Sequence, residues 1–445
     1  MARATLPRTH RTPIVGETQM QGRFRKRPGW YAGLTTKVAW FFQRPLYAPD
    51  SHITSIHDIV GRHDFYCLSG SDTFVASTHP DDDDTLTAFD QFVALGMNPD
   101  FCLQYINAPN ISIPEDGCII DPTYSGFTTS WVSRSNDFCS RVDPNEDWFC
   151  HRGGNRIIAE GDGWCAMDVG NTGFQDYCAD KVAEIHADYG EGGLESNGTY
   201  GFRMAGLLLD NVWSNEGTHE NNAGGPIDEY AASPASDAAW QAGYKVFLTK
   251  IRDAIRAVNP RGQVWINPGG TDPSVYVDEV DGIMFETWMT NWNGWEKRSQ
   301  EEVEFEFAVV DELMAKNKGA LIVPQGNSNS DHELMQYAHA GYLMVAHKSG
   351  RCFFRFQNGV DYRRFWDFPE FQYDLGAPLE DRTPFPSGRG YQRKFQRGLA
   401  LVNIHRTDGE ANYNLQGSYY KPDGTGPIST LTLPPQSGIT LRKAI

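Results

Sequence analysis

Two stretches decide the fold, Gly206-Leu207-Leu208-Leu209-Asp210 and Gly282-Ile283-Met284-Phe285-Glu286. In each, the apolar residues are consecutive rather than alternating, and the run ends in an acid. A strand that is buried on one face alternates polar and apolar residues, whereas a strand that is buried on both faces is apolar throughout. The two stretches therefore predict strands of a parallel sheet that helices cover.

Six further apolar runs resemble these two, and amphipathic segments with apolar residues three and four apart lie between them. The further runs are residues 38–42, 65–68, 100–106, 264–267, 320–324 and 342–346, and the helical segments are residues 175–188, 237–258, 301–316 and 332–340. Strand and helix alternate too regularly for an α+β protein. We predict an α/β fold, a (β/α)8 TIM barrel.

The chain outside the regular units divides into three segments. Residues 107–163, rich in Pro, Gly, Asp, Ser and Cys, separate the third and fourth strands and predict a long inserted loop within a barrel domain of residues 31–395. Residues 396–445 change to short alternating strands, which predicts a small C-terminal antiparallel β domain. Residues 1–30 form a basic arm, either a flexible leader or an attachment to a larger assembly.

Composition limits the partners of the 445-residue chain. Its formal net charge of −18 disfavours nucleic acid, and no apolar run is long enough to predict a membrane span. Aromatic residues make up 13% of the chain, which suits stacking on flat sugar faces but equally a large aromatic core. The place of action stays open, with extracellular and virion-associated roles as the alternatives, because residues 1–30 lack the apolar core of a secretory signal.

Neither a metal nor a cofactor is expected. The eight cysteines form no CxxC pair, and no phosphate-binding glycine loop, HExxH or GxSxG stands in a strand–turn–helix context. Five cysteines lie within 61 residues, from Cys118 to Cys178. Disulfides in the inserted loop and buried free thiols are equally compatible with this spacing.

Asp210 and Glu286 are the candidate catalytic residues. The βα loops at the C-terminal ends of the strands form the active face of a (β/α)8 barrel, and both acids directly end a strand. A pair of carboxylates on nearby strand ends is what glycoside hydrolysis requires, one as nucleophile or base and one as acid. The alternative is structural: Asp210 caps the next loop and Glu286 pairs with Arg351 or Arg355.

Several other polar and aromatic residues near strand ends are candidates for binding substrate. Each has a structural alternative, either packing of the aromatic ring or ordinary loop polarity. The candidates are Trp213, Trp288, Trp292, Gln325 and His347.

The motifs resemble those of a group of barrel glycosidases. Residues 166–171 (AMDVGN) and 206–212 (GLLLDNV) resemble the pattern "mDvtnp … GfDGiflDnv", and residues 281–288 (DGIMFETW) resemble "vDGi..E.w". On these motifs, and on a similar C-terminal β region, the chain is similar to the hypothetical glycosyl hydrolase family 15. It resembles more distantly the endo-α-1,4-galactosaminidase-like and α-galactosidase-like barrels.

The resemblance implies roles for four residues. Asp210 matches the nucleophile and Glu286 the acid/base of a retaining mechanism, Asp168 matches an acid expected to orient substrate or a loop, and Asn267 matches a polar residue that binds sugar or nucleophile. The sequence departs from the pattern at residues 204–205 (MA) and in the expanded third loop. The expanded loop leaves the substrate length and the shape of the cleft open.

The function that follows is hydrolysis of a glycosidic bond in an oligo- or polysaccharide, with retention of configuration expected from the resemblance. The alternative from a different class is a non-catalytic protein, either carbohydrate-binding or a structural protein of a virion or surface, on the same scaffold. A structure separates them, because two carboxyls more than about 10 Å apart could not act on one bond.

Overall fold

In the computed structural model of the chain, the described residues are 39–41, 64–69, 102–112, 138–159, 164–189, 205–215, 227–231, 236–291, 296–326, 331–346, 350–358 and 368–444. The basic arm of residues 1–30, Trp292 and His347 lie outside these ranges. Residues 33–445 form one compact unit. No helix in the described part of the chain is long and apolar enough to cross a bilayer.

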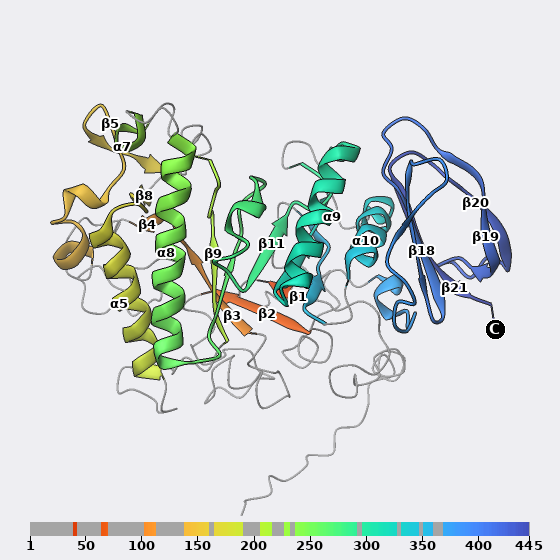
Figure 1. Cartoon of the computed structure of the whole chain (residues 1–445), viewed down its shortest axis with the longest axis horizontal. Helices are drawn as coiled ribbons and strands as arrows, with labels where there is room; N and C mark the ends of the chain where they lie inside the picture. Colours follow the sequence, from red (N-terminus) through yellow and green to blue (C-terminus); the bar gives the residue numbers. More distant parts are fainter. Residues whose placement is uncertain are drawn as a thin grey trace, which may run out of the picture. The chain divides into compact units, whose positions relative to one another are not determined.

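A parallel sheet of eight strands forms the centre of this unit (Figure 1). Its strands, in the order in which they pair, are β1 (Ala39–Phe41), β2 (Phe65–Ser69), β3 (Cys102–Asn107), β9 (Gly206–Asp210), β10 (Gln263–Ile266), β11 (Gly282–Glu286), β12 (Gly319–Val323) and β14 (Cys352–Phe354). Seven of the eight predicted strands are therefore present in their predicted places.

The sheet curls, with one face directed inward. Phe65 on β2 and Phe353 on β14 are near its opposite edges, yet their ring centroids lie 4.8 Å apart, and Phe65 also contacts Trp265 on β10. Among the described residues no ladder joins β14 to β1, so the structure is a mixed α/β fold with a nearly closed parallel sheet. Trp265 fills the interior because Gly282 and Gly319 leave room for its ring, where a Cβ would lie 2.3 Å and 2.1 Å from it.

The eighth predicted strand is wrong. Residues 342–346 belong to a helix and the turn after it, and the last strand of the sheet is β14. Helix α10 (His332–Val345) packs against the central sheet on one side and against the C-terminal sheet on the other, so nearly all of its side chains are buried. A helix that is buried all round is apolar all round, and a short apolar run of this kind cannot be distinguished from a buried strand by periodicity.

Helices α8 (Ser236–Val258), α9 (Gln300–Ala315) and α10 pack on the central sheet. Helix α5 (Thr172–Tyr189) and the short helix α7 (Asp228–Ala231) both contact α8. Helices α5 and α8 lie side by side (Figure 1). The connection between β10 and β11 differs from the predicted unit, because its regular structure is a single 3-10 turn, η6 (Pro273–Tyr276).

The inserted segment is more ordered than the predicted loop. Its described part contains a three-stranded sheet, β4 (Asn110–Ser112), β8 (Trp164–Ala166) and β7 (Ile158–Ala159), and a hairpin of β5 (His151–Arg152) and β6 (Asn155–Arg156). Two short helical turns precede them, η4 (Phe138–Val142) and η5 (Glu146–Trp148). The strands are two or three residues long, too short for a sequence pattern to indicate them.

Both alternatives for the cysteines occur, because Cys139 is in a disulfide while Cys150, Cys165 and Cys178 are buried free thiols.

The C-terminal antiparallel sheet has six strands. They pair in the order β16 (Thr383–Pro384), β17 (Gly390–Phe395), β18 (Gly398–Asn403), β21 (Ser437–Lys443), β19 (Glu410–Tyr420) and β20 (Ile428–Leu433). The sheet begins before residue 396, because β17 pairs with β18 along its whole length. A turn, η7 (Pro369–Gln372), and a short pair of strands, β13 (Gln325–Gly326) with β15 (Gln357–Asn358), complete the elements.

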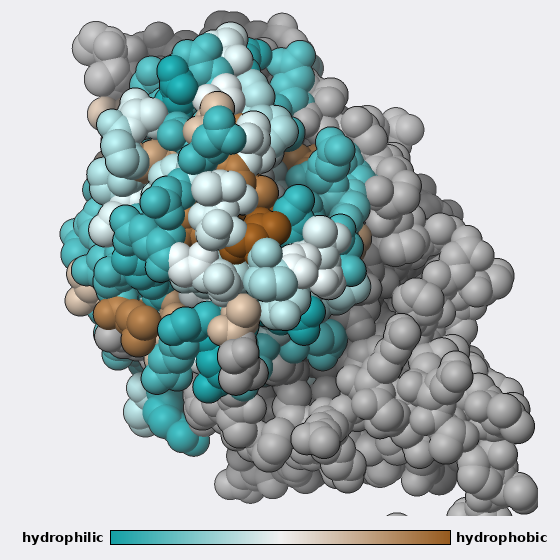
Figure 2. Space-filling model, turned by 90° about the vertical axis from the view of Figure 1, so that its right-hand side faces the viewer, coloured by the Kyte–Doolittle hydropathy of each residue, from teal (hydrophilic) through white to brown (hydrophobic). Residues whose placement is uncertain are grey.

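The outer strands of this sheet, β19 and β20, place many of their side chains in solvent. Figure 2 shows a mostly hydrophilic face here, with apolar residues in small separate spots.

Candidate active site

Three neighbouring strands bring polar side chains to one edge of the central sheet. Asp210 ends β9, Asn267 follows β10, and Glu286 ends β11. The strands are parallel and pair in this order, so their C-terminal ends meet at the same edge. Asp210 and Glu286 follow Leu208 and Met284 by two residues and so point to the same face. Leu208 and Met284 lie in the interior cluster, so both acids face the inside of the curled sheet.

Asn267 joins the two carboxylates. Its side-chain Nδ2 donates to Asp210 Oδ1 at 2.7 Å and to Glu286 Oε2 at 2.6 Å. Because both oxygens lie within these distances of one nitrogen atom, they are at most about 5.3 Å apart, the sum of the two. An amide nitrogen carries two hydrogens, one for each carboxylate. The backbone N–H of Gly269 donates to Asn267 Oδ1, which keeps the amide nitrogen directed at the pair.

Each carboxylate has a second donor of its own. Tyr105, on β3, donates its hydroxyl hydrogen to Asp210 Oδ2, and Gln325, on β13, donates from Nε2 to Glu286 Oε1. All four carboxylate oxygens of the pair thus accept a hydrogen bond from a side chain that a strand or strand end positions.

Burial and hydrogen bonding act on Asp210 in opposite directions. Burial raises the pKa of this carboxyl above its usual value, and the hydrogen bonds from Tyr105 and Asn267 partly offset that effect by stabilising the ionised form. Glu286 is 7% exposed. Like charges as close as these repel, so the pair favours one ionised and one protonated carboxyl.

Sequence reasoning missed two further residues at this edge and considered a third, Arg355, only as a structural partner of Glu286. Tyr105 contacts Asp210, Asn107 pairs in register with Asp210, and Arg355 is fully buried just after β14. Asn107 Oδ1 is buried and has no hydrogen-bond partner among the described residues, so it is free to accept one from a ligand. The signal was available for the first two, because Tyr105 and Asn107 stand at the end of the predicted third strand.

Asp168 takes part in a different contact. Its Oδ1 accepts from the hydroxyl of Tyr230 on α7 at 2.6 Å and from the backbone N–H of Gly170 at 2.8 Å, just before α5 begins. Burial raises the pKa of this carboxyl. The described contacts of Asp168 therefore fix a loop, the second of the two roles that the resemblance implies.

Two of the three tryptophans expected to bind substrate lie among the described residues, and they differ in position. Trp288 is fully buried, stacked on Phe307 of α9, and a ring in that place cannot contact a sugar; it is reassigned to the core. Trp213 is also largely buried, but its indole lies next to Gly269, where an added Cβ would be 2.6 Å from Nε1. It thus supports the loop that carries Asn267.

A cleft of about 240 Å³ opens beside Glu286. One wall is the loop after β10, and the other is formed by the end of β11 and the start of α9. The lining residues are Pro268, Gly270, Thr271, Asp272, Pro273, Met284, Phe285, Glu286, Arg298, Phe305 and Glu306.

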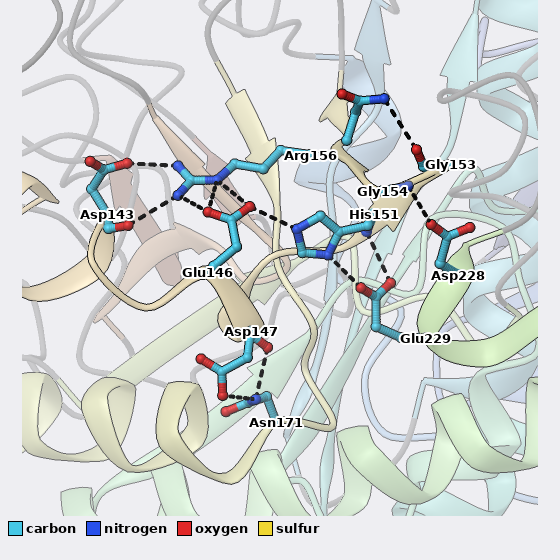
Figure 3. A network of polar contacts seen from close by, with 11 residues as sticks. Asp143, Glu146, Asp147, His151, Gly153, Gly154, Arg156, Asn171, Asp228 and Glu229 are labelled. Atoms are coloured by element: carbon cyan, nitrogen blue, oxygen red, sulfur yellow. Dashed lines mark hydrogen bonds and ion pairs between the residues drawn. The ribbon is translucent and has the colours of Figure 1, made fainter.

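A second polar network lies in the inserted segment (Figure 3). The ring of His151 lies between two carboxylates, with Nδ1 2.6 Å from Glu229 Oε1 and Nε2 2.9 Å from Glu146 Oε1. Arg156 pairs with Glu146 and, at 2.7 Å, with Asp143. These contacts attach the β5–β6 hairpin to α7.

The fold is that of an α/β protein with a curled parallel sheet. The two carboxylates joined at the C-terminal edge of this sheet suit acid–base and nucleophilic chemistry on one bond. The family model named hypothetical glycosyl hydrolase family 15 matches residues 121–399, more than half of the chain and the part that carries Asp210, Asn267 and Glu286. The chain belongs to this family.

The solved structures that resemble the chain do so weakly. The glycoside hydrolase domain of PelA from Pseudomonas aeruginosa is 11% identical, with a TM-score of 0.39 over 77% of this chain and 97% of that one. The maltogenic α-amylase AmyB from Thermotoga neapolitana is 10% identical, with a TM-score of 0.47 over 93% and 99%. Scores this low carry no argument about activity or substrate. No curated protein matches the sequence.

Proposed function

We propose that the protein hydrolyses a glycosidic bond of an oligo- or polysaccharide with retention of configuration, with Asp210 as nucleophile and Glu286 as acid/base. The observation that carries the proposal is the Asn267 bridge, which holds a carboxylate oxygen of each acid within about 5.3 Å of the other. Retaining glycosidases place their two carboxyls about 5–5.5 Å apart, whereas inverting ones need about 6.5–9.5 Å to admit a water molecule.

The first step forms a covalent ester. The Asp210 carboxylate attacks the anomeric carbon while the bond to the leaving oxygen breaks, and Glu286 gives its proton to that oxygen. The hydrogen bonds from Tyr105 and Asn267 favour the ionised form of Asp210, the form that attacks, and partly offset the burial that raises its pKa. They also orient the carboxylate toward the interior of the sheet, where substrate would enter from the strand ends.

The second step releases the sugar. The Glu286 carboxylate removes a proton from water as the water attacks the anomeric carbon, and the ester bond breaks to regenerate Asp210. Asn267 and Gln325 keep hydrogen bonds on both oxygens of Glu286 through the cycle. Asn107, with its free buried oxygen beside Asp210, is a further candidate to bind a sugar hydroxyl.

We also propose that the nearly closed sheet is a barrel. We expect the sheet to close into a (β/α)8 barrel, because side chains of β2 and β14 already meet inside it. Closure places the carboxylates inside the barrel, with the strand ends as the entrance for a sugar chain.

The test is hydrolysis of a panel of neutral and amino-sugar oligosaccharides by the wild type, Asp210→Asn and Glu286→Gln. We expect the wild type to cleave at least one member and each variant to lose nearly all turnover. The matched controls are Asp253→Asn and Glu301→Gln, exposed acids on α8 and α9, which should stay active. Full activity of Asp210→Asn would remove it as nucleophile. Binding without turnover by the wild type would favour a non-catalytic carbohydrate-binding protein.

A further inference from the structure

The wall of the central sheet is open between β10 and β11. These strands pair only at Trp265 with Gly282 and at Ile266 with Ile283, whereas β11 pairs with β12 along its whole length as far as Glu286. The edge of β11 from Met284 to Glu286 therefore has no neighbouring strand on the β10 side. The regular structure of the connection between the two strands is η6, so the chain places no α-helix between them.

The cleft beside Glu286 occupies this gap, and its walls are suited to a sugar ring. Phe305, on the first half of α9, is 43% exposed and gives the cleft an aromatic side chain, and Pro268 and Pro273 line it too. The volume of about 240 Å³ is below the roughly 300–1,000 Å³ of pockets for drug-sized ligands, which suits a single ring.

Arg298 supplies hydrogen-bond donors to the cleft. Its Nε donates to the backbone oxygen of Thr290 and lies 3.5 Å from Glu306 Oε1, contacts that fix the guanidinium in place. Its two terminal nitrogens have no hydrogen-bond partner among the described residues, so they can donate to ligand hydroxyls.

The polar groups of the cleft suit a neutral sugar better than an acidic one. Three lining residues carry carboxyl groups, Asp272, Glu286 and Glu306, against the single guanidinium of Arg298, and any of the three repels a uronate when it is ionised. A uronate would add a further negative charge to this site, whereas the hydroxyls of a neutral sugar can both donate and accept.

The position of the cleft determines which part of the substrate it can hold. It is lined by Glu286 but not by Asp210. In the proposed mechanism Glu286 protonates the leaving oxygen, so the sugar that departs in the first step lies on the Glu286 side. We propose that this cleft is the subsite for the leaving-group sugar, a neutral pyranose that stacks on Phe305 and accepts hydrogen bonds from Arg298. The inference rests on the proposed function.

The experiment compares two substrates that share the same glycone. One is the shortest neutral oligosaccharide that the wild type cleaves, and the other is the corresponding glycosyl fluoride, which has no leaving sugar. For Phe305→Ala we expect kcat/KM to fall about tenfold on the oligosaccharide and to stay within about twofold on the fluoride. Phe305→Tyr, which keeps an aromatic ring, should restore the oligosaccharide activity. Leu379→Ala removes another exposed apolar side chain that does not line the cleft and is the control.

The outcomes separate the two proposals. An equal loss on both substrates, or no loss on the oligosaccharide, would overturn the subsite while leaving the hydrolase in place. Absence of hydrolysis of either substrate by the wild type would contradict the proposed function itself, and the subsite with it. A faster reaction of the wild type on uronate-containing oligosaccharides than on neutral ones would overturn the assignment of a neutral sugar.

Discussion

Asn267 donates one amide hydrogen to each carboxylate of the pair, so its removal should change how the pair titrates. The bond to Asp210 stabilises the ionised form and lowers the pKa of that carboxyl. In Asn267→Ala the pKa of Asp210 should rise, and the acidic limb of the kcat/KM profile should move to higher pH. An unchanged limb, in a variant whose thermal unfolding shows it to be folded, would mean that Asn267 does not tune the nucleophile.

The roles of the two acids can be separated by chemical rescue. Asp210→Gly and Glu286→Ala should each lower kcat by about 10⁴-fold on natural substrate. With an aryl glycoside and added azide, the nucleophile variant should give a glycosyl azide of inverted configuration and the acid/base variant one of retained configuration. The opposite pairing of variant and product would exchange the two roles.

Ionisation of Glu306 should make the stability of the folded protein depend on pH. Burial raises the pKa of this carboxyl from 4.5 to about 7, so the folded protein holds a proton there that the unfolded chain releases. Stability should therefore fall as pH rises from about 4.5 to about 7, by about 3 kcal/mol in all. Glu306→Gln should lose this dependence, measured by urea unfolding at pH 5 and pH 8. Exposed Glu301→Gln is the control, and a wild-type slope in Glu306→Gln would refute the assignment.

At the scale of elements, the β5–β6 hairpin depends on a charged histidine. Both ring nitrogens of His151 lie within hydrogen-bond distance of carboxylate oxygens, and only the imidazolium can donate from both. Burial alone would lower the pKa of His151, but the hydrogen bonds to Glu146 and Glu229 outweigh it and raise the pKa above 6.5. The attachment to α7 is therefore complete below pH 6.5 and weakens as pH rises through the raised pKa.

This attachment predicts a pH-dependent hydrogen exchange in the hairpin. Protection of residues 151–156, corrected for intrinsic rates, should decrease above neutral pH in the wild type and be low at every pH in His151→Ala. The control is His332→Ala, which removes a histidine of α10 that pairs with Glu370 of η7 and should leave the hairpin unchanged. Protection that does not vary with pH would show that the hairpin is held by other contacts.

The elements also show why some predictions from sequence succeeded. Strands β9 and β11 are apolar throughout and end in an acid, and the structure has both with the predicted bounds. Residues 342–346 carry a similar apolar run, yet they complete α10 because sheets pack on both sides of that helix. The difference lies in the tertiary surroundings, which a local pattern does not contain.

At the candidate site, the sequence did not reveal the register between neighbouring strands. Strand ends were enough to single out Asp210 and Glu286, and the family resemblance added Asn267, but the bridge between them depends on which residues of β9, β10 and β11 lie side by side. Gln325 was predicted to bind hydroxyls because the sequence does not show that it lies beside Glu286. In the structure its side chain donates to Glu286. Trp288 was expected to stack on sugar because it follows Glu286 by two residues, but its side chain points into the core.

At the scale of the whole molecule, the C-terminal sheet is packed closely on helix α10. A Cβ at Gly438 on β21 would lie 2.6 Å from Ala340 Cβ and 3.0 Å from the backbone of Tyr337, both on α10. Gly438→Val should therefore force β21 away from α10 and lower Tm by about 1–3 °C, because overpacking typically costs about 1–3 kcal/mol. Thr430→Val, an exposed substitution on β20, should change Tm little. Equal Tm values for both variants would mean that the two surfaces are not tightly joined.

The central claim is that two carboxylates bridged by Asn267 cleave a glycosidic bond through a covalent intermediate. The most direct test is the anomeric configuration of the first product, followed by proton NMR in the first minutes after the wild type is mixed with its best oligosaccharide, before mutarotation. The carboxylate spacing predicts that the first product has the configuration of the substrate. A first product of opposite configuration would contradict the account.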